Sequence, residues 1–227
     1  MCGALGLFLS TDTRGEIAIN TIFFTIVERG KADKIIEQAR KVGSQNQTVL
    51  LGRGTSRSRF FTTRALKQRP KEIVMIEADQ SLDERLHQEL GSALSLHKRH
   101  KGIAFTIPFD SVDHPEEPLG QTEWQCILTI VDKGKAEACV KAARKAGAKG
   151  GTVIDGRGAG VPAHYYVDLQ IEPQKEIVII LAPTERSEAI QEQIIDDLEL
   201  NTTGAGMLLA LPVSRATGLV EELRRVP

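Results

Sequence analysis

The sequence predicts an α+β protein built from two tandem ferredoxin-like (βαββαβ) domains, each an antiparallel sheet with its helices on one face. Two observations carry this prediction: the sequence repeats itself at a constant offset, and both copies alternate strand and helix patterns in the same order. A third observation sets the class, because 41% hydrophobic residues, 26% charged residues and a net charge of −1 are typical of globular domains. This charge balance gives no general attraction to nucleic acid or to a membrane surface.

The internal repeat runs from Thr25 to Pro108 in the first copy and continues without a gap in the second. The motifs GKA, GRG and KEIV begin at residues 30, 52 and 71 and again at 134, 156 and 175, an offset of 104 each time. Self-similarity at a fixed offset marks a duplicated structural unit, here of about 90 residues. The predicted division is an N-terminal tail or extra strand at 1–19, a first domain at 20–112, a linker at 113–122 and a second domain at 123–227.

The second copy displays the order of elements most clearly. Apolar, β-branched runs predict strands at 124–132, 152–155, 175–182 and 207–213, and periodic runs predict helices within 133–151 and 183–200. We expect Asp132 to be the N-cap of the first helix and Gly147 to follow its C-terminus. Right-handed crossovers place the third strand antiparallel between the first two, so three loops emerge at the same end of each sheet.

Glycines and cations from these three loops meet at that end, which makes it a candidate anion site. A dinucleotide site or P-loop is not predicted, since extended sequence follows Gly160 and no Gly-Lys-Ser/Thr occurs. The glycines also have a purely structural interpretation, as hairpin and helix-end residues, and the sequence leaves both open. The candidate ligand-binding residues are Lys31, Gly52, Arg53, Gly54, Lys101 and Gly102 in the first copy, and Lys135, Gly156, Arg157, Gly158, Gly204 and Gly206 in the second.

The segment after the first GRG motif differs in charge from its counterpart in the second copy. From residue 52 to 70 it carries six Lys or Arg residues and no acid, with two adjacent Phe residues. Such a segment is suited to docking on an acidic protein, a polyphosphate or nucleic acid, although a solvated loop has the same composition. The candidate partner-binding residues are Arg57, Arg59, Phe60, Phe61 and Arg64.

Catalytic and metal sites are not predicted, because no nucleophile elbow, no H-E-x-x-H and no repeated carboxylate pair occurs. His97 and His100 have the spacing of two metal ligands but lack a third nearby. The three cysteines, Cys2, Cys126 and Cys139, form no C-x-x-C pair, which favours a reducing, cytoplasmic location. The apolar N-terminal run is too short for a membrane span.

Each copy resembles the nitrogen regulatory protein P-II family. The second copy carries this resemblance in GKAEACVKAARKAGAKGGTVIDGRGAG, IEPQKEIVIILAP and LELNTTGAGMLLALPV, and the first in ERGKADKIIEQARKVGSQNQTVLLGRGT, RPKEIVMIEAD and KGIAFTIP. The resemblance implies a ferredoxin-like fold that trimerises and binds adenine nucleotides in clefts between subunits. It also implies that the GRG motifs begin the mobile T-loop. The phosphate-contacting glycine loop of the family corresponds to Gly204-Ala205-Gly206 and, with a weaker match, to Lys101-Gly102. The sequence departs from the family at Ala205 and Met207, where nucleotide-binding members have an acid and a lysine.

The leading hypothesis is therefore a non-enzymatic, P-II-like regulator in the cytoplasm. It would bind a small anionic effector such as ATP, ADP or AMP, would require no cofactor, and would act on a protein partner, a transporter or a metabolic enzyme, in nitrogen metabolism. A homotrimer is expected from the resemblance, and nucleic acid is a less favoured ligand. The alternative is a binding module that docks nucleic acid or an acidic protein through the basic segment of the first copy. A third hypothesis, an enzyme for a phosphorylated metabolite, lacks a repeated acid–base pair.

Overall fold

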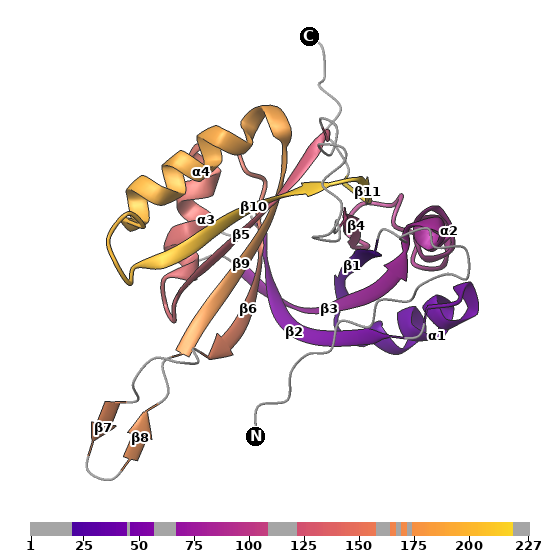
Figure 1. Cartoon of the computed structure of the whole chain (residues 1–227), viewed down its shortest axis with the longest axis horizontal. Helices are drawn as coiled ribbons and strands as arrows, with labels where there is room; N and C mark the ends of the chain where they lie inside the picture. The colour runs from indigo at the N-terminus through magenta and orange to yellow at the C-terminus, as the bar shows by residue number, and fades with distance from the viewer. Residues whose placement is uncertain are drawn as a thin grey trace, which may run out of the picture.

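The computed structural model describes residues 20–44, 46–56, 67–108, 122–157, 164–166, 169–171 and 174–219. In these ranges, four helices pack outside one nine-stranded antiparallel sheet, and a two-stranded hairpin stands apart from it (Figure 1). Both halves have the order βαββαβ, so the predicted fold class is confirmed. Outside the described ranges lie the tail at 1–19, nearly all of the linker, Gly158 and the five residues Arg57, Arg59, Phe60, Phe61 and Arg64.

In the first half, helix α1 shows how the sequence selects its elements. Ala32, Ile35, Ala39 and Val42 recur at helical spacing and are buried, and Gly43 ends the helix in a left-handed conformation with φ of 115°. The buried stripe fixes the side of the helix that faces the sheet. The elements of this half are β1 (Asn20–Glu28), α1 (Ala32–Val42), β2 (Gln47–Ser56), β3 (Lys67–Asp79), α2 (Gln80–Ala93) and β4 (Ile103–Pro108).

In the second half, helix α3 tests the two predicted helix boundaries. Gly147 follows its C-terminus with φ of 101°, as predicted. The predicted N-cap at Asp132 is wrong, because the helix begins at Ala136 with Lys135 in the N-cap position and Asp132 hydrogen-bonded to Lys175. The elements of this half are β5 (Trp124–Asp132), α3 (Ala136–Lys145), β6 (Thr152–Arg157), β9 (Gln174–Pro183), α4 (Thr184–Leu198), β10 (Gly206–Val213) and β11 (Arg215–Thr217), with the hairpin β7 (His164–Tyr166) and β8 (Leu169–Ile171) between β6 and β9.

The nine-stranded sheet joins the two halves and closes on itself. Its strand order is β10-β5-β9-β6-β2-β3-β1-β4-β11, so each half contributes a block in which the third strand lies between the first two. Strands β2 and β6 pair at the centre, and β10 continues past Ser214 into β11, which pairs with β4 of the first half. In Figure 1 the sheet curves round from β5 to β4, and the β10–β11 strand crosses the gap between the halves.

The apolar residues of the described ranges form three clusters. The helices of each half cover the convex side of their own part of the sheet, with one cluster built around Ile35 and Leu86 and the other around Val140 and Ile190. The third cluster lies on the concave side and takes residues from both halves, because alternate strand residues point there. It consists of Ile26, Ile73, Phe105, Ile107, Cys126, Ile154, Ile179 and Val213.

The joint between β2 and β6 requires a glycine on the β2 side only. Gly52 pairs with Ile154, and a Cβ atom on Gly52 would lie 2.7 Å from the carbonyl oxygen of Val153 and 2.8 Å from a methyl group of Ile73. A Cβ on Gly156, the repeat counterpart, would meet nothing closer than 3.8 Å. The repeated GRG motif therefore performs different structural roles in the two halves.

We expect Gly52→Ala to destabilise the protein by about 2 kcal/mol, because the added methyl group overpacks the joint and pushes backbone against backbone. Gly156→Ala is the matched control and should change the free energy of unfolding by less than about 0.5 kcal/mol. Chemical denaturation of both variants measures the difference. Equal stabilities of the two variants would contradict the close approach of β6 to Gly52.

Candidate functional site

The three loops predicted to meet do lie at one end of each half, but two of their glycines have a structural reason to be there. Gly102 and Gly206 are repeat counterparts; Gly102 immediately precedes β4 and Gly206 is the first residue of β10. A Cβ atom on them would lie 2.7 Å from the carbonyl oxygen of Ile26 and 2.6 Å from that of Ile130. Close approach to the neighbouring strand thus accounts for both glycines without a ligand.

The N-termini of α1 and α3 are each occupied by a carboxylate of the protein itself. Glu72 Oε2 accepts hydrogen bonds from the backbone N–H groups of Lys31 and Ala32, at 2.9 and 2.8 Å. Its repeat counterpart Glu176 accepts from Gly134 and Ala136, at 3.0 and 2.8 Å. These glutamates complement the positive end of the helix dipole in place of an anionic ligand. A ligand at this end of the molecule must therefore be held mainly by side chains.

The pKa of Glu72 reflects this role. Burial of the carboxylate raises the pKa, but hydrogen bonds from the backbone N–H groups of residues 30 to 32 outweigh burial and lower it below the ordinary value. The N–H groups of Lys31 and Ala32 are donors that the helix leaves without an intrahelical acceptor. Glu72 is therefore ionised at neutral pH and available to close the helix end.

Arg53, a candidate ligand-binding residue, is engaged across the joint between the halves. Its guanidinium donates to Asp155 Oδ2 at 2.6 Å and also to Glu176 Oε1. The bond to Asp155 is the main cause of a raised pKa for Arg53. Arg53 therefore bridges two carboxylates of the second half.

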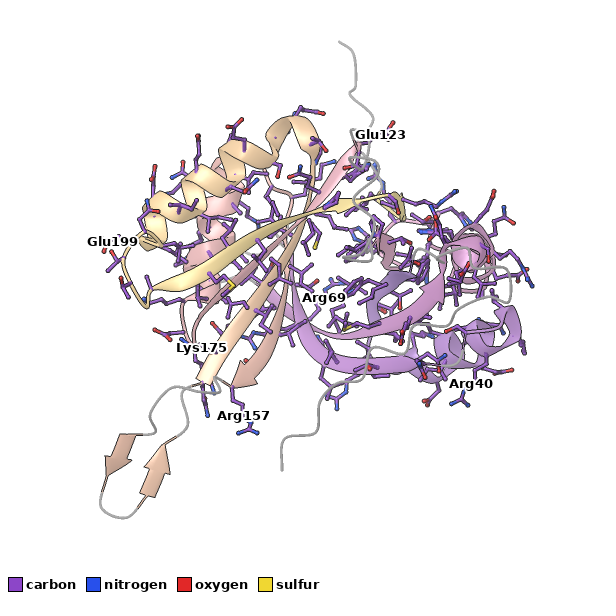
Figure 2. The ribbon with its side chains drawn as sticks, viewed as in Figure 1. Arg40, Arg69, Glu123, Arg157, Lys175 and Glu199 are labelled. Atoms are coloured by element: carbon purple, nitrogen blue, oxygen red, sulfur yellow. The ribbon has the colours of Figure 1, made fainter. Side chains whose placement is uncertain are left out.

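An open hollow of 440 Å³ lies at the end of β6 and β9 in the second half. Figure 2 shows two of its cations, Arg157 and Lys175, at the same end of the sheet, close to the base of the β7–β8 hairpin. Three cations and one carboxylate line it, which gives a net positive charge suited to an anion. The lining residues are Lys133, Asp155, Gly156, Arg157, Gln174 and Lys175.

The cations of the hollow are positioned by short contacts with their neighbours. Lys133 donates from Nζ to the side-chain oxygen of Gln174. Lys175 Nζ lies 2.6 Å from Asp132 Oδ1, and this hydrogen bond lowers the pKa of Asp132. Because the side chain of Lys175 is mostly buried against this partner, Lys133 and Arg157 are the more exposed cations of the hollow.

Of the candidate residues in the second copy, the structure brings Gly156 and Arg157 into the hollow. Lys135, at the N-cap of α3, and Gly204, in the turn before β10, lie at the same end without lining it. In the first copy, Gly52 and Gly54 pair with β6, and Lys101 and Gly102 immediately precede β4. Sequence reasoning missed four lining residues, Lys133, Asp155, Gln174 and Lys175. The repeated KEIV motif could have pointed to Lys175 and to its neighbour Glu176, because it recurs in both copies.

Within the described ranges, no group of three or more His, Cys, Asp or Glu residues is arranged to hold a metal ion. Burial raises the pKa of the Cys126 thiol to about 12 and that of Cys139 to about 11, so both are protonated at neutral pH. None of the helices in those ranges has the length and apolarity needed to cross a bilayer.

Residues 124–222, which include the hollow, match the family model of the nitrogen regulatory protein P-II. The C-terminal half is therefore similar to the P-II family. The match covers less than half of the chain and leaves the first half outside it, so the duplication rests on the sequence repeat and on the shared element order. No curated protein matches the chain.

Solved structures that resemble the chain include P-II proteins. Arabidopsis thaliana PII bound to citrate is 24% identical, with a TM-score of 0.33 over 43% of this chain and 81% of that one. The Bacillus subtilis GlnK–ATP complex is 12% identical, with a TM-score of 0.31 over 40% of this chain and 85% of that one. A protein of unknown function from Galdieria sulphuraria is 12% identical, with a TM-score of 0.31 over 86% of this chain and 98% of that one.

Proposed function

We propose that the protein is a non-enzymatic P-II-type regulator whose P-II-like C-terminal half binds a small anionic effector. The observation that carries the proposal is the hollow at the end of β6 and β9, which gathers Lys133, Arg157 and Lys175 around one carboxylate. An anion gains from this local charge without help from a helix N-terminus, since Glu176 already occupies the start of α3. Effector binding would change the segment between β6 and β9, which begins at the hollow, and thereby alter contact with a protein partner.

The class of effector follows from the chemistry of the lining. Guanidinium and ammonium groups favour carboxylates and phosphates, and an arginine can hold either one with two hydrogen bonds. The adenine nucleotides ATP, ADP and AMP are the first candidates, and citrate represents the tricarboxylates. A transporter or an enzyme of nitrogen metabolism is the partner that the similarity of the C-terminal half to the P-II family favours.

Binding of these anions is tested by isothermal titration calorimetry with ATP, ADP, AMP and citrate in turn. We expect at least one to bind, and Arg157→Ala to weaken that binding at least tenfold because a charged hydrogen-bond partner is lost. Arg40→Ala is the matched control: Arg40 is exposed on α1, far from the hollow in Figure 2, and its loss should leave the affinity unchanged. Absence of binding by all four anions, or equal affinity in the Arg157→Ala variant, would refute the proposal.

Assembly is a separate part of the proposal. A trimer of this chain would contain six βαββαβ units, and light scattering measures whether it forms. The concave faces of the two sheet halves already pack against each other within one chain, so a trimer must form through other surfaces. A monomer in solution would refute trimerisation and leave effector binding unaffected.

A further inference from the structure

We infer that each chain has one effector site, in the second half, and that Arg53 of the first half is its positioning residue. This inference rests on the proposed function and adds a role for a residue outside the P-II-like half. It depends on three features of the structure: the use of the equivalent first-half residues Gly52 and Arg53 in the joint, the contacts of Arg53, and the place of Asp155 in the lining.

Among the described residues of the first half, the joint takes up the equivalents of two lining residues of the hollow. The counterparts of Gly156 and Arg157 are Gly52 and Arg53, which pair with Ile154 and Val153 of β6. The carbonyl oxygen of Val153 lies where a side chain of residue 52 would be, so no open space remains there. The counterparts of Asp155 and Gln174 are Leu51 and Pro70, so two polar residues of the lining are replaced, whereas the counterparts of Lys133 and Lys175 are the cations Arg29 and Lys71.

Arg53 contacts one lining residue of the hollow, Asp155, and also Glu176, the sequence neighbour of the lining residue Lys175. Through Asp155 it holds β6 just before Gly156 and Arg157. Through Glu176 it holds the carboxylate that closes the N-terminus of α3, next to the turn that carries Lys133. A single guanidinium thus fixes the two segments that supply the cations.

Arg53 also neutralises the one carboxylate of the lining. Without Arg53, the negative charge of Asp155 would face an incoming anion directly and weaken its binding. The same contact connects strand β2 of the first half to the site. Arg53 therefore links effector binding in the second half to β2 of the first half.

The test compares Arg53→Ala, Asp155→Asn and the double variant by calorimetry, using the anion that binds the wild type with the highest affinity. We expect one bound anion per chain and a loss of affinity of about tenfold in Arg53→Ala. The double variant should regain most of this loss, because the carboxylate that Arg53 neutralises is gone. A role in stability alone would leave the double variant as weak as Arg53→Ala, or weaker, and would overturn the inference.

A second measurement needs no ligand. In NMR spectra of the free protein, Arg53→Ala should shift the backbone amide resonances of Gly134 and Ala136, whereas the control Arg40→Ala should not. Three results would each overturn the inference: two bound anions per chain, full affinity in Arg53→Ala, or unshifted amide resonances. None of them would contradict the proposed function, provided that Arg157→Ala still weakens anion binding. Failure of the wild type to bind any of the four anions would overturn the proposed function as well as this inference.

Discussion

Replacing Glu176 with alanine should lower the free energy of unfolding by about 3 kcal/mol, the largest single effect expected at this end of the molecule. Glu176 is buried, accepts two backbone hydrogen bonds at the start of α3 and pairs with Arg53. Its removal leaves helix N–H groups without their acceptor and a partly buried guanidinium with only Asp155. Urea denaturation of Glu176→Ala against the wild type measures this loss.

Glu72→Ala provides the internal comparison, because Glu72 closes the N-terminus of α1 as Glu176 closes that of α3 but, among the described residues, makes no ion pair with Arg53. Glu72 accepts the equivalent hydrogen bonds from Lys31 and Ala32, so its loss should cost about 1 to 2 kcal/mol. The difference between the two variants isolates what the bridge across the halves contributes. If both variants lose equal stability, the ion pair of Glu176 with Arg53 adds nothing to the folded state.

Acidification from pH 7 to pH 4 should remove about 3 kcal/mol of stability through His87 alone. Burial lowers the pKa of His87 to about 4; Asp83 opposes this shift and Arg215 adds to it. Because the folded pKa lies below the ordinary value of 6.5, the unfolded chain binds the proton first. Stability from this residue is therefore complete above about pH 6.5 and is lost as the pH falls towards 4.

The surroundings of His87 explain why the neutral ring is preferred. Its Nε2 lies 3.0 Å from the Thr106 hydroxyl, which donates its own proton to Asp83 and so must accept from Nε2–H. Its Nδ1 lies 2.8 Å from the Thr217 hydroxyl and accepts from it. Both nitrogens of the neutral ring are satisfied, and the described charged groups that face it are Asp83 on α2 and Arg215 on β11.

His87→Gln should flatten the dependence of stability on pH between 6.5 and 4, whatever its effect at neutral pH. His97→Gln is the matched control, since His97 is exposed, and should follow the wild-type profile. Denaturation curves across this range for the three proteins separate His87 from other acid-sensitive groups. A wild-type profile in His87→Gln would refute the assignment.

Much of the fold could be predicted because it depends on local pattern. The alternation of apolar residues in Trp124–Asp132 and Gln174–Pro183 and the periodic Ala and Val residues of α3 specify their own elements. The repeat then specified the same topology twice. The wrong N-cap at Asp132 has a clear cause: the carboxylate that closes α3 is Glu176, which is distant in sequence.

The joint and the site could not be predicted in the same way, because both depend on differences between the copies. The residues around Gly52 do not reveal that β6 approaches it. Because the two GRG motifs are identical, the sequence predicts Arg53 and Arg157 equally as ligand-binding residues. The sequence does contain the relevant difference, Leu51 against Asp155 at counterpart positions. The effect of this difference depends on the pairing of β2 with β6, and the pattern of one copy alone does not reveal that pairing.

The strand from β10 into β11 has a consequence for synthesis on the ribosome. The first half emerges early, yet its β4 remains an unpaired edge and its concave apolar residues remain exposed until Arg215–Thr217 has been made. A ribosome that stalls between the halves would therefore expose an aggregation-prone nascent chain, which chaperones would need to shield.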